Sequence, residues 1–177
     1  MALLAEEVVE EWLNCQGYFT IRGIRAGVDE IDILATNPND KGQLKFRHIE
    51  VQASINPVSY LTPLTKDLQK KLGVAPMSMR RRTPEVMKDC VKNWIEKKFL
   101  KNKKMQIRNS LYDGDWSFEL VVNKVKFPEE LEIFEQLGIK VHYLKDIVND
   151  MLKGDQLIKS ASGADLVNLM LLGKGND

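Results

Sequence analysis

The chain has 177 residues, of which 44% are hydrophobic and 29% are charged. This composition is typical of a soluble globular protein, and the length suits one domain with a sizeable core. No apolar run approaches the roughly 20 residues that a membrane-spanning helix needs. The amino-terminal sequence MALLAEEVVEEWL turns acidic at Glu6, unlike a signal peptide. We therefore expect a cytoplasmic protein with no membrane contact, in which Cys15 and Cys90 are reduced thiols.

The net charge of +1 conceals an uneven distribution. Residues 66–108 contain 14 Lys and Arg against 4 Asp and Glu, a balance of +10, whereas the remainder carries 12 against 21, or −9. A basic segment in an otherwise acidic protein suggests an anionic partner. A solvated helix face explains the same charges equally well, so charge alone leaves both interpretations open.

The first part of the chain predicts a helix followed by a meander of strands. Apolar residues at helical spacing precede Gly17, and segments rich in β-branched and aromatic residues follow it. The turn-forming sequence NPNDKGQ separates the last two strands. The helix is expected at 2–14 and the strands at 18–22, 30–36 and 44–53.

The second part predicts mainly helices, with two further strands. Thr62-Pro63 and Thr83-Pro84 each provide an N-cap and a proline at the first helical position. The sequences WSFELVVNKV and IKVHYL predict strands with a short helix between them, and this βαβ arrangement favours a parallel pair. The remaining helices are expected at 63–72, 84–103, 146–153 and 164–172.

This order predicts a single mixed α/β domain over residues 1–177, in which helices cover a central mixed sheet of about five strands. Residues 1–60 would form a helix and a three-stranded meander, residues 61–110 a basic helical insertion, and residues 111–177 the βαβ unit and the carboxy-terminal helices.

Acidic residues interrupt two of the predicted strands, in the sequences DEIDILA and HIEVQAS. Side chains alternate along a strand, so His48, Glu50 and Gln52 share one face, and Asp32 can lie across from Glu50 on that face. The opposite face, with Ile49 and Val51, is expected to be the core side. Two neighbouring carboxylates repel each other unless a cation lies between them, and oxygen ligands of this kind suit Mg²⁺. A pair of ordinary surface acids is the alternative.

The sequence resembles the PD-(D/E)XK nuclease superfamily, in its Holliday junction resolvase-like and type IV restriction-like branches. The resemblance rests on a helix bearing acidic residues, then EIDILA, then HIEVQ, and it covers residues 2–54. It implies a restriction-endonuclease-like three-layer α/β fold and metal-assisted hydrolysis of DNA. Asp32 and Glu50 would bind Mg²⁺, or Mn²⁺ in its place. Glu6 and the Val51 carbonyl would be further ligands.

Gln52 occupies the position at which this superfamily usually has lysine. Glutamine can hydrogen-bond but supplies no charge. Gln52 could therefore orient the attacking water while Lys66 or Lys70 supplies the missing charge, or the domain could bind nucleic acid without cutting it.

Basic residues after the acid motifs are candidate contacts for a nucleic-acid backbone. Arg80, Arg81 and Arg82 are the preferred candidates, with lysines of the following helix, and Ser54 either contacts substrate or caps a turn. His48 is expected to support the acids through hydrogen bonds, and His142 to be structural. The apolar sequence GADLVNLMLL would close the core or form a homodimer contact. No organic cofactor is expected, and a protein-interaction domain is the weakest alternative.

Overall fold

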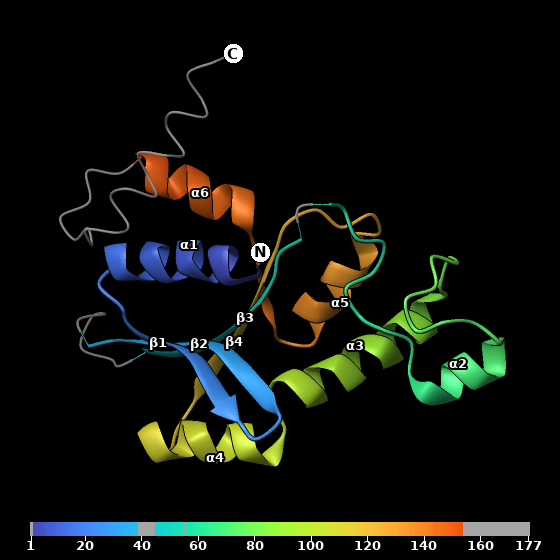
Figure 1. Ribbon diagram of the computed structural model, residues 1–177, viewed down its shortest axis with the longest axis horizontal. Coiled ribbons are helices and arrows are strands. Elements are labelled where there is room, and N and C mark those ends of the chain that lie inside the picture. Colours follow the sequence, from blue (N-terminus) through green and yellow to red (C-terminus); the bar gives the residue numbers. More distant parts are fainter. Residues whose placement is uncertain (1, 39–44, 55, 154–177) are drawn as a thin grey trace.

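The computed structural model describes residues 2–38, 45–54 and 56–153, which form an α/β fold around an open five-stranded sheet (Figure 1). The expected helix at 164–172 and most of the turn-forming sequence NPNDKGQ lie outside the described residues. The strands are β1 (Phe19–Ala26), β2 (Asp29–Asn37), β3 (Lys45–Gln52), β4 (Trp116–Val122) and β5 (Lys140–Tyr143). The helices are α1 (Ala2–Cys15), α2 (Lys66–Leu72), α3 (Pro84–Lys98), α4 (Asn102–Leu111), α5 (Glu129–Gln136) and α6 (Leu144–Lys153).

The strands follow the order β1-β2-β3-β4-β5 across the sheet. The first three form an antiparallel meander, and β4 and β5 each continue the sheet in parallel with the preceding strand. The β4–α5–β5 segment is therefore the parallel βαβ unit that the sequence predicts. The long connection from β3 to β4 contains α2, α3 and α4.

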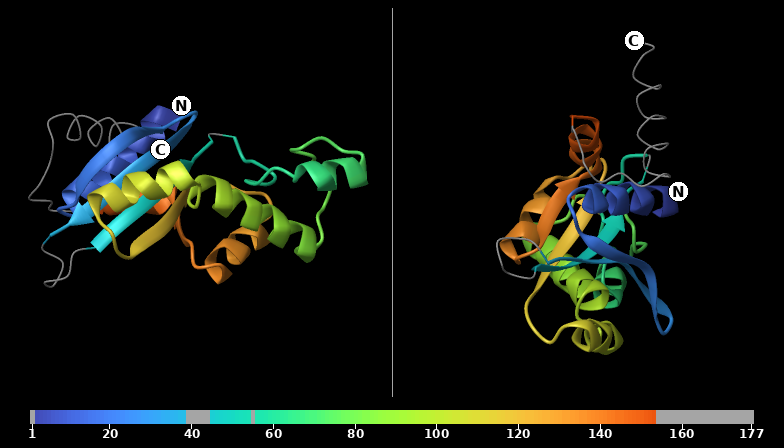
Figure 2. Two further views of the ribbon diagram at one scale, coloured as in Figure 1. Left: turned by 90° about the horizontal axis from the view of Figure 1, so that it is seen from below. Right: turned by 90° about the vertical axis from the view of Figure 1, so that its left-hand side faces the viewer.

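Helices cover both faces of the sheet, so that the molecule has three layers. Helices α1 and α6 pack together on one face, and α3, α4 and α5 lie on the other (Figures 1 and 2). Helix α2 lies away from the sheet at one end of the molecule in both figures. The expected three-layer α/β architecture with a mixed five-stranded sheet is confirmed.

Apolar residues fill the space on both sides of the sheet. On the α1 side Ile49 and Val51 belong to the core, as expected. On the opposite side Leu120 and Val122 of β4 pack with residues of α3 and α5, such as Trp94, and form a second core. The Ile49 face is therefore a core side as expected, and the face of Glu50 is buried as well, because the helices between β3 and β4 fold back over it.

Two helices differ from their expected bounds for local reasons. Thr65, rather than Thr62, caps α2, because the Thr62 hydroxyl and backbone N–H instead donate to the buried carboxylate of Glu130. The long helix expected at 84–103 ends at Lys98, and α4 begins three residues after Phe99. Phe99 is fully buried and its ring packs edge-on against His48, so the break serves to insert this side chain beneath the sheet.

Other expectations concern membranes and thiols. Across residues 2–38, 45–54 and 56–153, no helix combines the length and the apolar character that crossing a bilayer requires. Cys15 and Cys90 are not joined in a disulfide, and Cys90 is buried in α3.

Candidate active site

Asp32 and Glu50 lie opposite each other on neighbouring strands. The β2–β3 register pairs Ile33 with Ile49 and Leu34 with His48, and one further step places Asp32 across from Glu50 on the same face. Asp32 is 8% exposed and Glu50 is completely buried. The predicted pairing of the two acids across the hairpin is therefore present, although it lies beneath helices rather than on an open face.

The Asp32 carboxylate lies in an environment that disfavours its charge. Burial and then the neighbouring Glu50 carboxylate raise the pKa of Asp32 to about 7, although a hydrogen bond from the Val51 backbone N–H at 2.7 Å and the charge of Lys98 oppose this shift. The Val51 hydrogen bond and the Lys98 charge therefore only partly compensate the ionised Asp32 carboxylate for its burial and for the charge of Glu50. A cation placed beside it would stabilise the ionised form.

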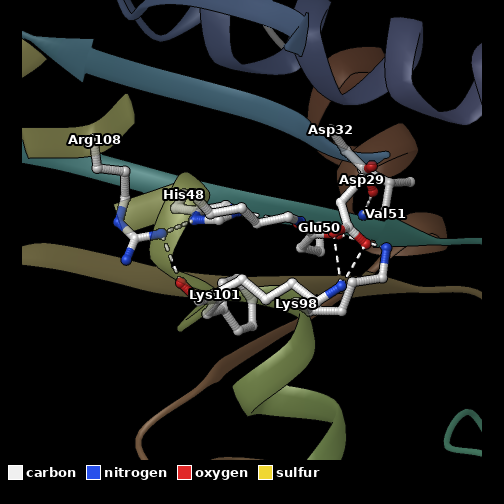
Figure 3. Close-up of polar contacts among 10 residues, drawn as sticks. Asp29, Asp32, His48, Glu50, Val51, Lys98, Lys101 and Arg108 are labelled. Atoms are coloured by element: carbon white, nitrogen blue, oxygen red, sulfur yellow. Dashed lines mark hydrogen bonds and ion pairs between the residues drawn. The ribbon is translucent and has the colours of Figure 1, made fainter. Parts of the chain in front are cut away.

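The Glu50 carboxylate, by contrast, has three donors from the chain itself (Figure 3). Its Oε1 accepts from Lys104 Nζ at 2.7 Å and from His48 Nε2 at 3.0 Å, and its Oε2 accepts from Lys98 Nζ at 2.7 Å. Burial acts to raise the pKa of Glu50, but the His48 hydrogen bond and the two ammonium charges outweigh it and hold the pKa below its ordinary value. Glu50 is therefore ionised at neutral pH.

His48 connects Glu50 to Arg108 of α4 through hydrogen bonds at its two ring nitrogens. Arg108 Nη1 lies 2.9 Å from His48 Nδ1 and 2.8 Å from the Phe99 carbonyl oxygen. Because a guanidinium can only donate, Nδ1 must be the acceptor, and the imidazole proton is on Nε2 and points at Glu50. Burial lowers the pKa of His48 to about 4, so the ring is neutral at physiological pH. The expected supporting role of His48 agrees with this geometry.

Glu6 of α1 lies close enough to the acid pair for its charge to interact with that of Glu50. It is 8% exposed, and burial together with Glu30 raises its pKa, with Glu50 also contributing. However, no group of three or more His, Cys, Asp and Glu side chains within the described ranges is arranged to hold a metal ion. Glu6 therefore lies near Asp32 and Glu50 but does not form a metal-binding group with them, and its role as a ligand remains a prediction.

Gln52 and Ser54 lie at the end of β3 and just beyond it. Gln52 is partly exposed, and Ser54 is exposed with its backbone carbonyl accepting from the Asn123 side chain at 2.7 Å. This contact ties the segment after β3 to the segment after β4. The side chains of both residues remain accessible from solvent.

The lysines expected to compensate for Gln52 lie elsewhere. Lys66 and Lys70 belong to α2, which lies at the end of the molecule distant from β3 (Figures 1 and 2). The expectation that they supply charge at the acid pair is therefore wrong. A helix that follows a strand in sequence need not return to it, and here α3 and α4 return instead.

Only two of the three consecutive arginines are available to a ligand. Arg80 and Arg81 are exposed, and Arg81 lies 3.5 Å from Glu129. Arg82 is 7% exposed, stacks over the Tyr60 ring and donates to the Thr62 carbonyl oxygen at 2.8 Å. Its predicted contact with nucleic acid is wrong, because the guanidinium is used to hold the segment that precedes α2.

The sequence contains a signal for the basic residues that do reach Glu50. Val91, Trp94 and Lys98 follow one another at helical spacing, so Lys98 continues the buried stripe of α3 rather than its solvated face. Lys104 and Arg108, which are both buried, are four residues apart on α4 and form its inner face. Lys98 and Lys104 were expected only as general nucleic-acid contacts, and Arg108 was not identified.

The residues present suit a hard divalent cation. Asp32 and Glu50 provide only oxygen donors, and Asp32 is a buried carboxylate with a raised pKa that retains acceptor capacity beyond its one hydrogen bond from Val51. Ligands from Glu6 and the Val51 carbonyl remain predictions from the resemblance. Mg²⁺ binds well through one or two carboxylates while keeping several waters.

Comparison with known proteins identifies no family. No protein-family model and no curated protein matches this chain. A crystal structure of a protein of unknown function, AF1548, is similar at 14% sequence identity and a TM-score of 0.47, over 97% of this chain and 78% of that chain.

Proposed function

We propose that this protein is a Mg²⁺-dependent nuclease that hydrolyses phosphodiester bonds in DNA. The observation that carries this proposal is the buried Asp32–Glu50 pair with Lys98, whose side chain is partly exposed and whose ammonium lies 2.7 Å from Glu50. Two carboxylates and a lysine are the groups that the resemblance to PD-(D/E)XK nucleases requires. On this proposal the lysine would be Lys98 of α3, in place of a lysine at the position of Gln52.

Each residue would have a distinct part in the reaction. Asp32 and Glu50 would bind the ion, which when bound supplies positive charge to the phosphate and lowers the pKa of a coordinated water. Lys98 would place a second positive charge beside the phosphate, since its side chain is 30% exposed. Gln52, at the end of β3, would hydrogen-bond the attacking water. His48, Lys104 and Arg108 are positioning residues that keep Glu50 ionised and oriented.

DNA is the proposed substrate because residues 66–108, which include the helices that cover the acid pair, carry a charge balance of +10. A groove between the β1–β2 hairpin and α4 is lined by residues that include Arg25 and Lys103. Cations of this kind bind phosphates without reading sequence. We also propose a cytoplasmic location, for which the absence of a disulfide between Cys15 and Cys90 is the support. A homodimer remains a prediction.

A second candidate function is a nuclease-like domain that binds nucleic acid without cutting it, as a regulatory subunit. The observation that favours it is the saturation of Glu50 by Lys98, Lys104 and His48. With these donors Glu50 is stable as an anion in the absence of any bound ion. On this alternative the cluster is structural, and DNA binding would be salt-dependent with no cleavage.

The Asp32→Asn substitution tests the proposal with little structural disturbance. Asparagine keeps the acceptor for the Val51 N–H but cannot ionise, so cleavage of labelled DNA in Mg²⁺ or Mn²⁺ is expected to fall by about a thousandfold or more. Asp29→Asn is the matched control, because Asp29 is an acid of the same strand whose carboxylate is paired with Lys101 at 2.7 Å. Equal cleavage by the Asp32→Asn and Asp29→Asn variants would refute the nuclease proposal. No cleavage by the unaltered protein on junction, flap, duplex and single-stranded DNA would support the non-catalytic alternative.

A further inference from the structure

The two oxygens of Glu50 are held in unequal ways. Oε1 is bound by Lys104 and His48, whose side chains are 1% and 0% exposed, and Arg108 holds His48 in turn. The side chains of Lys104 and His48 are therefore enclosed by the fold. Oε2 is bound by Lys98, whose side chain is 30% exposed. Lys98 is therefore the one of these three partners whose side chain solvent reaches.

Lys98 also lies among the other acids of this region. The charges of Asp32 and Asp29, in addition to that of Glu50, act to raise its pKa, although burial opposes them. Figure 3 shows Lys98, Glu50, Asp32 and Asp29 gathered at one end of β3. A divalent cation shared by Asp32 and Glu50 would have to approach the region that this ammonium occupies. The Lys98 ammonium and the metal ion are both positively charged and would repel each other at hydrogen-bonding distance. Glu50 Oε2 therefore cannot bind both of them at once.

We propose that Lys98 is a displaceable counter-ion of Glu50, which holds Oε2 until a divalent cation replaces it and which is then released towards the phosphate of the substrate. This inference rests on the proposed function, because it concerns the same ion. Lysine suits such a role, since its ammonium is a compact charge on a flexible four-carbon stem.

Because the metal ion must replace Lys98 at Glu50, its affinity for the protein would be lower than its affinity for Asp32 and Glu50 without Lys98. The Lys98–Glu50 contact must be broken first, and a charged hydrogen bond is worth roughly 1.5 kcal/mol or more, about tenfold in affinity. An anion that attracts the released ammonium would restore affinity for the ion. Metal and substrate would therefore each strengthen the binding of the other.

Calorimetric titration of the full chain with Mn²⁺ alone tests the inference without measuring cleavage. The Lys98→Met variant is expected to bind Mn²⁺ about tenfold more tightly than the unaltered protein. Lys101→Met is the matched control, because Lys101 forms an equally short ion pair, 2.7 Å from Asp29, that does not involve Glu50. Its affinity is expected to stay within about twofold of the unaltered protein. Lys98→Gln, which keeps a hydrogen-bond donor without the charge, is expected to be intermediate and replaces Lys98→Met if that variant does not fold.

The outcomes separate this inference from the proposed function. Equal or weaker Mn²⁺ binding by Lys98→Met and Lys98→Gln, with binding that is abolished by Asp32→Asn, would overturn the displacement and leave the metal site in place. A similar gain in Mn²⁺ affinity in Lys101→Met would also overturn the displacement of Lys98, because the gain would then come from removing any nearby positive charge. Absence of Mn²⁺ binding in every variant would overturn both proposals.

Discussion

Two buried glutamates on adjacent parallel strands, Glu50 of β3 and Glu119 of β4, face opposite sides of the sheet. Glu119 is 1% exposed, and it accepts two hydrogen bonds from Arg47, at 2.9 and 2.6 Å, together with one from Ser117 and one from His142. Burial opposes ionisation here too, but these partners lower the pKa of Glu119 to about 2. Both glutamates are therefore ionised and fully paired by the chain.

The difference between them lies in what surrounds each pair. Glu119 has no acidic neighbour among the groups that shift its pKa, and Arg47 is enclosed by the Trp12 and Tyr18 rings. Glu50 has a second carboxylate, Asp32, opposite it, and one of its lysines reaches solvent. A buried, paired carboxylate is by itself a structural feature. A second carboxylate and a partly exposed lysine partner are what make Glu50 a candidate for chemistry.

The largest expected effect is a contrast in stability between substitutions in the two regions. Glu119→Gln leaves the Arg47 guanidinium buried without its counter-ion, and the free energy of unfolding is expected to fall by about 3 to 5 kcal/mol. Asp32→Asn removes a buried charge and is expected to raise it by about 1 to 2 kcal/mol at pH 8. Urea denaturation of both variants measures this contrast. If Glu119→Gln were neutral and Asp32→Asn strongly destabilising, the roles assigned to the two regions would be reversed.

The two regions are also expected to respond to pH in opposite directions. The pKa of Asp32 is raised, so the folded state binds the extra proton and stability falls as pH rises from about 4 to about 7, by no more than about 4 kcal/mol. The pKa of Glu119 is lowered, so its contribution is present above about pH 4.5 and is lost towards pH 2, on the order of 3 kcal/mol. The free energy of unfolding measured from pH 3 to pH 8 should therefore lose its upper slope in Asp32→Asn. A slope that persists unchanged in that variant would assign it to another group.

The smallest expected effect concerns the lysines of α2, which are remote from both glutamates. Replacing Lys66 and Lys70 together with methionine is expected to change the cleavage rate at saturating DNA by less than about twofold, because neither contacts the acid pair. Any effect should appear as weaker DNA binding at higher salt. Single-turnover cleavage measures the rate, and a large fall there would restore the sequence-based expectation that α2 supplies charge to the site.

Strand alternation accounts for the part of the site that was predictable from sequence. It places Asp32 and Glu50 on one face, with His48 beside them, and the observed register agrees. It could not reveal that this face is buried, since the covering helices are remote in sequence. Lys98 continues the apolar stripe of α3 and could have been recognised as an inward-facing lysine. The partner of Lys98 could not have been predicted, because Glu50 is 48 residues away in the sequence.

The order of helices and strands, the mixed α/β class and the pairing of the two acids could be predicted from the sequence, since these depend on local periodicity and on a hairpin. Which cations neutralise those acids is known only from the folded structure. That choice depends on the break at Phe99, which brings Lys98 and Lys104, on separate helices, to within 2.7 Å of one carboxylate. The folded structure also shows that Lys66 and Arg82 lie away from the acid pair. Long-range packing sets such contacts, and no local pattern of residues specifies them.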